Sequence, residues 1–256
     1  MGRPRKRLRV TGNPEQLTNC QHVFPAASIK RFADLNGLVT VRHLGTKKQF
    51  KAKPDEDIFC ASCVWDYHAE SGYMLDIENQ FLALAGEILA SRVVGLNAEQ
   101  SETVTKFWAL WYWRAELRNA PEPDRTVHGV GGEPLTNEQR DKIESVGGAF
   151  VLSSGNRLPG RFLAGFQIFK GIDECSSQLQ GGRWGIVRAK AGEFLVSDSP
   201  GRTLAVPLTP EIGLHFESRD CTIPEPEVAR ANACARESAK SYYFARDFSV
   251  CPGIND

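Results

Sequence analysis

The stretch RWGIVRAKAGEFLVSDSPGRTLAVPLTPEIGLHF, residues 183–216, decides the fold. Four short segments within it, WGIVRA, EFLVS, TLAVPL and IGLHF, have the two-residue apolar period that is typical of β-strands. Glycines and prolines separate the segments, as they do in the turns between antiparallel strands. The stretch therefore predicts an antiparallel meander of four short strands in the last third of the chain.

The residues before this stretch have mainly the pattern of helices. Apolar side chains recur at helical spacing along residues 75–94, and Gly95-Leu96-Asn97 ends that run. Asn97 or Ser101 can cap a second helix that continues to about Asn119 and contains the aromatic segment FWALWYWRAELR. A third long helix is predicted over residues 158–178, with one apolar side made of Phe162, Phe166, Phe169 and Ile172.

Shorter elements complete the pattern on both sides. LVTVRHL (38–44) alternates as a strand, with KKQFKAK as its partner across a turn, and a final helix is expected from Glu225 to about Lys240. YYFAR follows as a last strand. The order predicts a single α+β domain over residues 21–256, with a helical part at about 21–180 packed on antiparallel strands and a closing helix at about 181–250.

Composition restricts the class of protein. The 256 residues are 41% apolar and 24% charged, which is ordinary for a globular chain. No window approaches the roughly 18 uninterrupted apolar residues of a membrane span, and the basic N-terminal segment lacks the apolar region of a secretory signal. We therefore expect a cytoplasmic protein without membrane contact. The seven cysteines are odd in number and irregularly spaced, which predicts reduced thiols.

The charges are sorted along the chain although they sum to zero. Residues 1–20 hold two prolines and two glycines and predict a flexible basic arm, while the rest of the chain is mildly acidic. GRPRKR (2–7) resembles the AT-hook, whose arginines lie in the minor groove of A·T-rich DNA, although Met1 stands where that motif has an arginine. We expect contact with DNA or RNA through residues 2–9, and the alternative is a solubilising tail. The basic residues concerned are Arg3, Arg5, Lys6, Arg7 and Arg9.

One cysteine pair has the spacing of a metal-binding motif. Cys60 and Cys63 could share a zinc ion with His68 as a third ligand. Only elimination offers His43 or Cys20 as a fourth. A single C-x-x-C is a weak signal, and buried or incidental cysteines are the favoured interpretation.

Several polar residues each have a structural and a functional interpretation. Ser197 and Asp198 can accept backbone N–H groups in a turn that Pro200 fixes, or Asp198 can act as a general base or metal ligand at a strand end. Arg114 leaves an aromatic helix and needs a carboxylate, a phosphate or an aromatic face. His22 precedes a proline corner, where a histidine is more often structural than catalytic.

Taken together, these stretches resemble a mainly bacterial family known as domain of unknown function 4238. The similar segments are QHVFPAASIKRFADLNG (21–37), MLDIENQFLALAGEI (74–88), FWALWYWRAELR (107–118), 183–216 and VARANACARESAKSYYFA (228–245). The resemblance implies an α+β fold and a set of polar positions, without an established activity. Those positions are His22, Glu78, Arg114, Ser197, Asp198 and Asn232. The family's second glutamate on the first long helix falls near Ala85 here, which puts a paired carboxylate in question.

Two functions remain open from the sequence. The leading hypothesis is a nuclease-like or phosphoesterase-like hydrolase in which His22, Glu78, Arg114 and Asp198 converge in a pocket. Arg114 would hold a phosphate, Glu78 and Asp198 would bind a divalent metal or activate water, and His22 would move a proton. The alternative is a non-catalytic module that binds nucleic acid through its basic arm, or a protein partner or second copy through its domain. A toxin or defence role fits either function.

Overall fold

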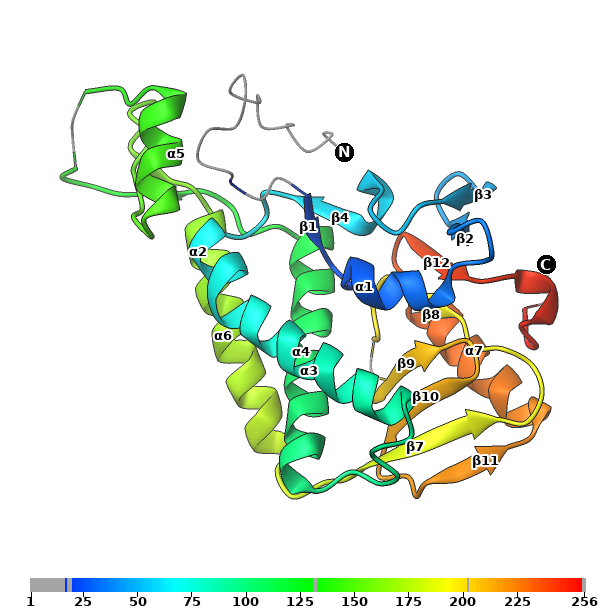
Figure 1. The fold of residues 1–256 in the computed structure, drawn as a ribbon. Helices are drawn as coiled ribbons and strands as arrows, with labels where there is room; N and C mark the ends of the chain where they lie inside the picture. The colour runs from blue at the N-terminus through cyan, green and yellow to red at the C-terminus, as the bar shows by residue number, and fades with distance from the viewer. Residues whose placement is uncertain (1–16, 18–19, 131–132, 202, 255–256) are drawn as a thin grey trace.

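The computed structural model describes residues 17, 20–130, 133–201 and 203–254 (Figure 1). The predicted nucleic-acid contacts at Arg3, Arg5, Lys6, Arg7 and Arg9 lie outside the described residues. The described chain has helices and two four-stranded sheets, so the predicted α+β class is confirmed.

Local sequence explains where the long helices begin and end. Helix α3 covers Leu75–Leu89, and α4 covers Ala98–Asn119. The Asn97 side chain accepts the backbone N–H of Gln100, while the Gln100 side chain accepts the N–H of Asn97. Thr136 and Gln139 repeat this capping box before α5, Asn137–Ser145. Each cap satisfies backbone donors that the first helical turn leaves without partners, which stabilises a helix by about 1 kcal/mol.

The buried side of the third long helix differs from the prediction. Helix α6, Arg161–Gln178, buries Ala164, Gly165, Ile168, Gly171 and Ile172. Phe166 and Phe169 are instead 68% and 55% exposed, so the predicted phenylalanine stripe is wrong. The small residues face the core because a Cβ atom at Gly171 would lie 2.1 Å from the Trp113 ring of α4.

The strands divide between two sheets, which corrects the predicted single meander. One sheet has the order β11-β7-β10-β9 and the other has the order β3-β2-β12-β8. EFLVS supplies β8, which pairs with β12 in the second sheet, so the chain leaves the first sheet between β7 and β9. Strand β11 runs parallel to β7, while the other pairs in these two sheets are antiparallel. The strands of the first sheet are Trp184–Ala189 (β7), Ala205–Thr209 (β9), Ile212–Phe216 (β10) and Cys221–Ile223 (β11), and those of the second are Val39–His43 (β2), Gln49–Ala52 (β3), Val196–Ser197 (β8) and Tyr242–Ala245 (β12).

Short strands and helices connect the long helices and the two sheets. Strand β1 (Cys20–His22) pairs with β4 (Cys60–Ser62), and β5 (Arg125–Thr126) pairs with β6 (Arg157–Leu158). Helix α1 covers Ala26–Ile29, α2 covers Tyr67–Ala69, and the closing helix α7 covers Glu225–Ser238. The remaining turns are η1 (Lys30–Phe32), η2 (Asp57–Phe59), η4 (Phe248–Val250) and the π-type segment η3 (Glu70–Met74).

A single large apolar cluster joins the helices to both sheets. Phe24 packs on Trp111 of α4 and on Phe244 of β12, with ring centroids 4.8 and 6.4 Å apart. The Trp184 indole of β7 donates a hydrogen bond to the Thr105 hydroxyl of α4, 2.9 Å away. Helix α4 therefore lies in the middle of the structure, with α3 and α6 beside it (Figure 1).

Candidate functional site

The Asp198 carboxylate is hydrogen-bonded to the main chain of residues 240 and 241. Its Oδ1 accepts the backbone N–H of Lys240 at 2.7 Å and its Oδ2 accepts that of Ser241 at 2.8 Å. The side chain is fully buried. Burial raises the pKa of Asp198, while the two N–H donors and the Arg118 charge act in the opposite direction. The carboxylate thus joins the end of β8 to the turn before β12, more than 40 residues later, and not to the N–H groups of its own turn as the structural interpretation predicts.

Ser197 and Asn232 also bond to the backbone around them. The Ser197 hydroxyl donates to the carbonyl of Ser199. The Asn232 side chain accepts the N–H of Leu195 at 2.9 Å and donates to the carbonyls of Glu193 and Pro252. Ser197 and Asn232 line one cavity of about 40 Å³. A space of that size holds about one water molecule, not a nucleotide.

Arg114 is the centre of a buried charge cluster. Its guanidinium donates to Glu78 and, at 2.9 Å, to Glu70, and it lies 5.4 Å from the centroid of the Trp65 ring. The Trp65 indole donates to Glu70 as well. Burial tends to lower the pKa of Arg114, but the carboxylates of Glu70 and Glu78 outweigh it, so the pKa is raised and the arginine stays charged.

Two glutamates, Glu70 and Glu78, pair with Arg114 in this cluster. Glu70 and Glu78 are eight residues apart, which places them about 80° apart around a regular α-helix. The π-type segment η3, with non-helical backbone at Gly72, adds residues to one turn and lets both side chains reach Arg114. Regular helical spacing does not predict this arrangement, so Glu70 is not among the predicted site residues.

Arg118, one turn after Arg114 on α4, is a second residue of the site that the sequence did not predict. Its Nη2 donates to the Ile58 carbonyl at 2.8 Å, and its Nη1 lies 3.7 Å from Asp198 Oδ2. The guanidinium also lies 5.0 Å from the centroid of the buried Tyr242 ring. The spacing of four residues from Arg114 within the aromatic helix was the feature of the sequence that could have indicated Arg118.

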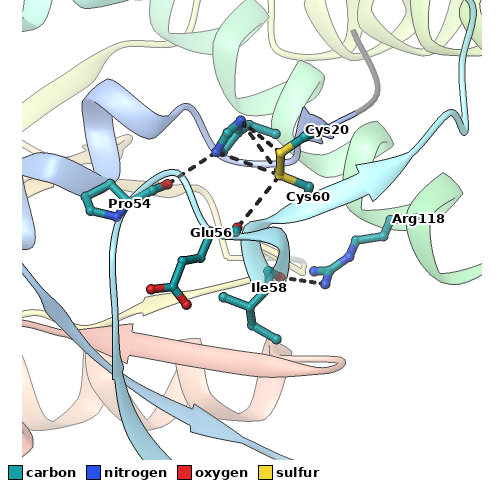
Figure 2. The surroundings of a disulfide bond; sticks show 7 residues. Cys20, Pro54, Glu56, Ile58, Cys60 and Arg118 are labelled. Atoms are coloured by element: carbon teal, nitrogen blue, oxygen red, sulfur yellow. Dashed lines mark hydrogen bonds between the residues drawn. A yellow bond between two sulfur atoms is a disulfide. The ribbon is translucent and has the colours of Figure 1, made fainter. Parts of the chain in front are cut away.

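His22 lies at a third location, next to two sulfur atoms. Its Nε2 is 3.2 Å from the Pro54 carbonyl oxygen, and its Nδ1 is 4.0 Å from the Sγ atoms of both Cys20 and Cys60. Cys20 and Cys60 form a disulfide bond (Figure 2). The prediction of reduced thiols is therefore wrong for these two cysteines, because β1 and β4 bring them together across 40 residues of sequence.

The structure does not bring the residues of the hydrolase hypothesis together. His22 contacts Pro54 and the cysteines, Arg114 and Glu78 bind each other, and Asp198 binds the backbone of residues 240 and 241. Within the described part of the chain, no hydrogen bond or ion pair connects these three groups. The predicted convergence in one pocket is therefore not found.

The group of residues that could bind a metal ion differs from the predicted one. In the described residues, Cys20, His22 and Cys60 form the group whose donor atoms could hold a metal ion. Cys63 and His68 are not in it. Cys60–Ser62 is a strand, so Cys63 does not share a helical turn with Cys60. His68 lies elsewhere, beside Gly147 after α5. Neither Glu78 nor Asp198 belongs to such a group in the part of the chain that the structure describes.

Comparison with known proteins adds no relative: the chain matches no protein-family model, no curated protein and no solved structure. The resemblance to the family of unknown function therefore stays an expectation. None of the described helices is long and apolar enough to cross a membrane.

Proposed function

We propose that the protein binds nucleic acid without hydrolysing it, and that the basic residues between positions 3 and 9 contact the phosphates. The observation that carries this proposal is the sorting of charge. Residues 1–9 hold five basic and no acidic side chains, whereas residues 10–256 hold 26 basic against 31 acidic ones. A local basic segment on an acidic chain is the arrangement that nucleic-acid binding by electrostatic attraction needs.

The β2–β3 hairpin supports the same function from within the described domain. Lys47, Lys48, Lys51 and Lys53 are exposed along the edge strand and its turn, and the Phe50 side chain between them is 38% exposed. Cations next to an exposed aromatic ring suit a nucleic-acid backbone and an unstacked base. Lysines on an edge strand also prevent strands of different molecules from pairing, which is the competing explanation.

The hydrolase has less support because its required groups bind separate partners. Asp198 would have to give up two backbone hydrogen bonds to reach a substrate. Arg114, at 1% exposure, is already paired with two carboxylates. A binding protein has no need for either side chain to be accessible.

Titration of the full chain with labelled nucleic acid tests the proposal. Fluorescence anisotropy would be followed with A·T-rich duplex, G·C-rich duplex and single-stranded RNA at several salt concentrations. Replacing the five basic residues of segment 3–9 by glutamine is expected to weaken binding by at least about tenfold at low salt. The magnitude of the slope of log K against log salt should fall by up to about 4.5 on duplex DNA, since each of the five lost phosphate contacts contributes roughly 0.9.

Two controls make the result specific. A matched variant changes five exposed basic residues elsewhere, Lys170, Arg183, Lys190, Arg219 and Arg230, to glutamine and should bind as the unchanged protein does. Asp198→Ala, examined at a temperature where it is folded, should also retain its affinity. Equal losses in the matched variant and in the segment variant would overturn the proposed role of segment 3–9.

A further inference from the structure

Cys20, His22 and Cys60 are positioned by backbone pairing and not by the disulfide alone. In the antiparallel β1–β4 ladder, His22 lies directly opposite Cys60, and Cys20 lies two residues from His22 on the same strand. Residues two apart on a strand point to the same face. The ladder therefore presents two sulfur atoms and one imidazole on one face, with the ring nitrogen Nδ1 4.0 Å from each sulfur.

The imidazole is oriented for use as a ligand. Its Nε2 lies 3.2 Å from the Pro54 carbonyl, an oxygen that only accepts hydrogen bonds, so the ring donates Nε2–H there. In that tautomer Nδ1 carries the lone pair and lies 4.0 Å from both sulfur atoms. The Cys60 sulfur is also 3.9 Å from Nε2, so a small rotation of the ring is needed to aim Nδ1 at it. A backbone carbonyl on the far nitrogen is the usual support of a metal-binding histidine. Figure 2 shows Pro54 on one side of this group and Cys20 and Cys60 on the other.

We propose that the reduced protein binds Zn²⁺ through Cys20, His22 and Cys60, and that the Cys20–Cys60 disulfide and the zinc site are two exclusive states of one group. Two thiolates and one imidazole are ligands that zinc prefers, with Zn–S near 2.3 Å and Zn–N near 2.0–2.1 Å. Ligand atoms at these distances lie about 3.4–3.8 Å apart in a tetrahedral site. The present Nδ1-to-sulfur distances of 4.0 Å need little adjustment, and the two sulfur atoms move apart once the disulfide is reduced.

Reduction of the disulfide followed by zinc binding converts the first state into the second. A dithiol or a phosphine with water supplies two electrons and two protons, the S–S bond breaks, and two thiols form while the reductant becomes a disulfide or a phosphine oxide. Zn²⁺ then replaces the two thiol protons, which leave to solvent, and forms two Zn–S bonds and one Zn–N bond. Water or another small ligand completes the fourth position.

Each of the two states holds β1 against β4. Reduced, metal-free protein lacks both connections, although the backbone ladder remains. Under reducing conditions, zinc therefore supplies a second connection between β1 and β4 beside the backbone ladder. This role is independent of whether residues 3–9 bind nucleic acid.

Metal titration of the full chain, reduced with a phosphine, tests the proposal. Co²⁺ is expected to give sulfur-to-metal charge-transfer absorption with one equivalent bound, and Zn²⁺ should displace it. The protein without reductant should give neither signal. Cys20→Ser, His22→Ala and Cys60→Ser should each weaken zinc binding by at least about tenfold. Cys63→Ser and His68→Ala serve as matched controls and should leave binding unchanged.

Alkylation of the unaltered protein covers the case in which a variant fails to fold. Zinc should protect Cys20 and Cys60 of reduced protein from iodoacetamide, and mass spectrometry of the peptides would show it. Absence of this protection, or of the cobalt signal, would overturn the proposal. An equal loss of zinc affinity in Cys63→Ser would also overturn it, in favour of the C-x-x-C pair.

Discussion

Two buried charges near helix α4 are neutralised in different ways. Arg114 is paired with the carboxylates of Glu70 and Glu78, whose side chains are 14% and 16% exposed. Asp198 is fully buried and holds the backbone N–H groups of Lys240 and Ser241. The partners of Arg114 can rotate away to solvent, whereas the partners of Asp198 are fixed in the main chain. A buried charge is thus an indicator of function only after its partners are known.

The two sites should therefore differ in how well they tolerate replacement of a carboxylate by its amide. At the Arg114 cluster, a neutral amide can replace one carboxylate because one acceptor oxygen is enough for the guanidinium N–H that it receives. At Asp198, both oxygens accept main-chain donors, so an amide nitrogen has no suitable position. Three substitutions test this comparison, from the largest expected loss of stability to the smallest.

Arg114→Ala should cause the largest loss. It leaves two glutamates beside the Trp65 ring without their cation, and breaking one side of a buried ion pair costs about 3–5 kcal/mol. Urea unfolding followed by circular dichroism measures the change. Arg92→Ala is the control, since Arg92 forms an exposed pair with Glu87 and its loss should change the free energy of unfolding far less. Similar losses for both variants would show that burial does not strengthen the Arg114 cluster.

Asp198→Asn should cost about 2–3 kcal/mol, although it keeps the size and shape of the side chain. One of the two N–H groups, of Lys240 or Ser241, would face an amide nitrogen in place of an oxygen and lose its acceptor. The same urea measurement applies, and slowed exchange of these two amide protons in the unchanged protein is an independent check. Wild-type stability in Asp198→Asn would mean that the corner does not depend on both oxygens.

Short-range signals in the sequence predicted the local structure well. Asn97, one of the two predicted caps, caps α4, and the strand pair at 38–53 forms as expected. The structural interpretation of Ser197 and Asp198 holds only in part. Asp198 accepts backbone N–H groups, but they belong to Lys240 and Ser241, more than 40 residues later, and Ser197 donates to the Ser199 carbonyl. The resemblance marked Arg114 and Asn232, and both are buried polar anchors in the structure.

Long-range arrangement was not predictable from these patterns. Strand β8 pairs with Tyr243 and Phe244, more than 40 residues later, and no local pattern indicates that choice of sheet. The Cys20–Cys60 pair depends on the β1–β4 ladder, whereas the C-x-x-C spacing pointed to Cys63.

The inward side of α6 shows a related limit. Large apolar residues were expected to face the core, but close contact with Trp113 favours Gly171 there.

Glu78→Gln should cost the least of the three, about 1 kcal/mol. The glutamine carbonyl can accept the same guanidinium N–H from Arg114, and Glu70 still balances the charge. The loss reflects a charge-assisted hydrogen bond replaced by a neutral one. Urea unfolding of Glu78→Gln beside Asp198→Asn gives the comparison directly, since both replace a carboxylate by its amide. A larger loss at Glu78 than at Asp198 would mean that side-chain charge, and not main-chain bonding, makes a carboxylate irreplaceable in this protein.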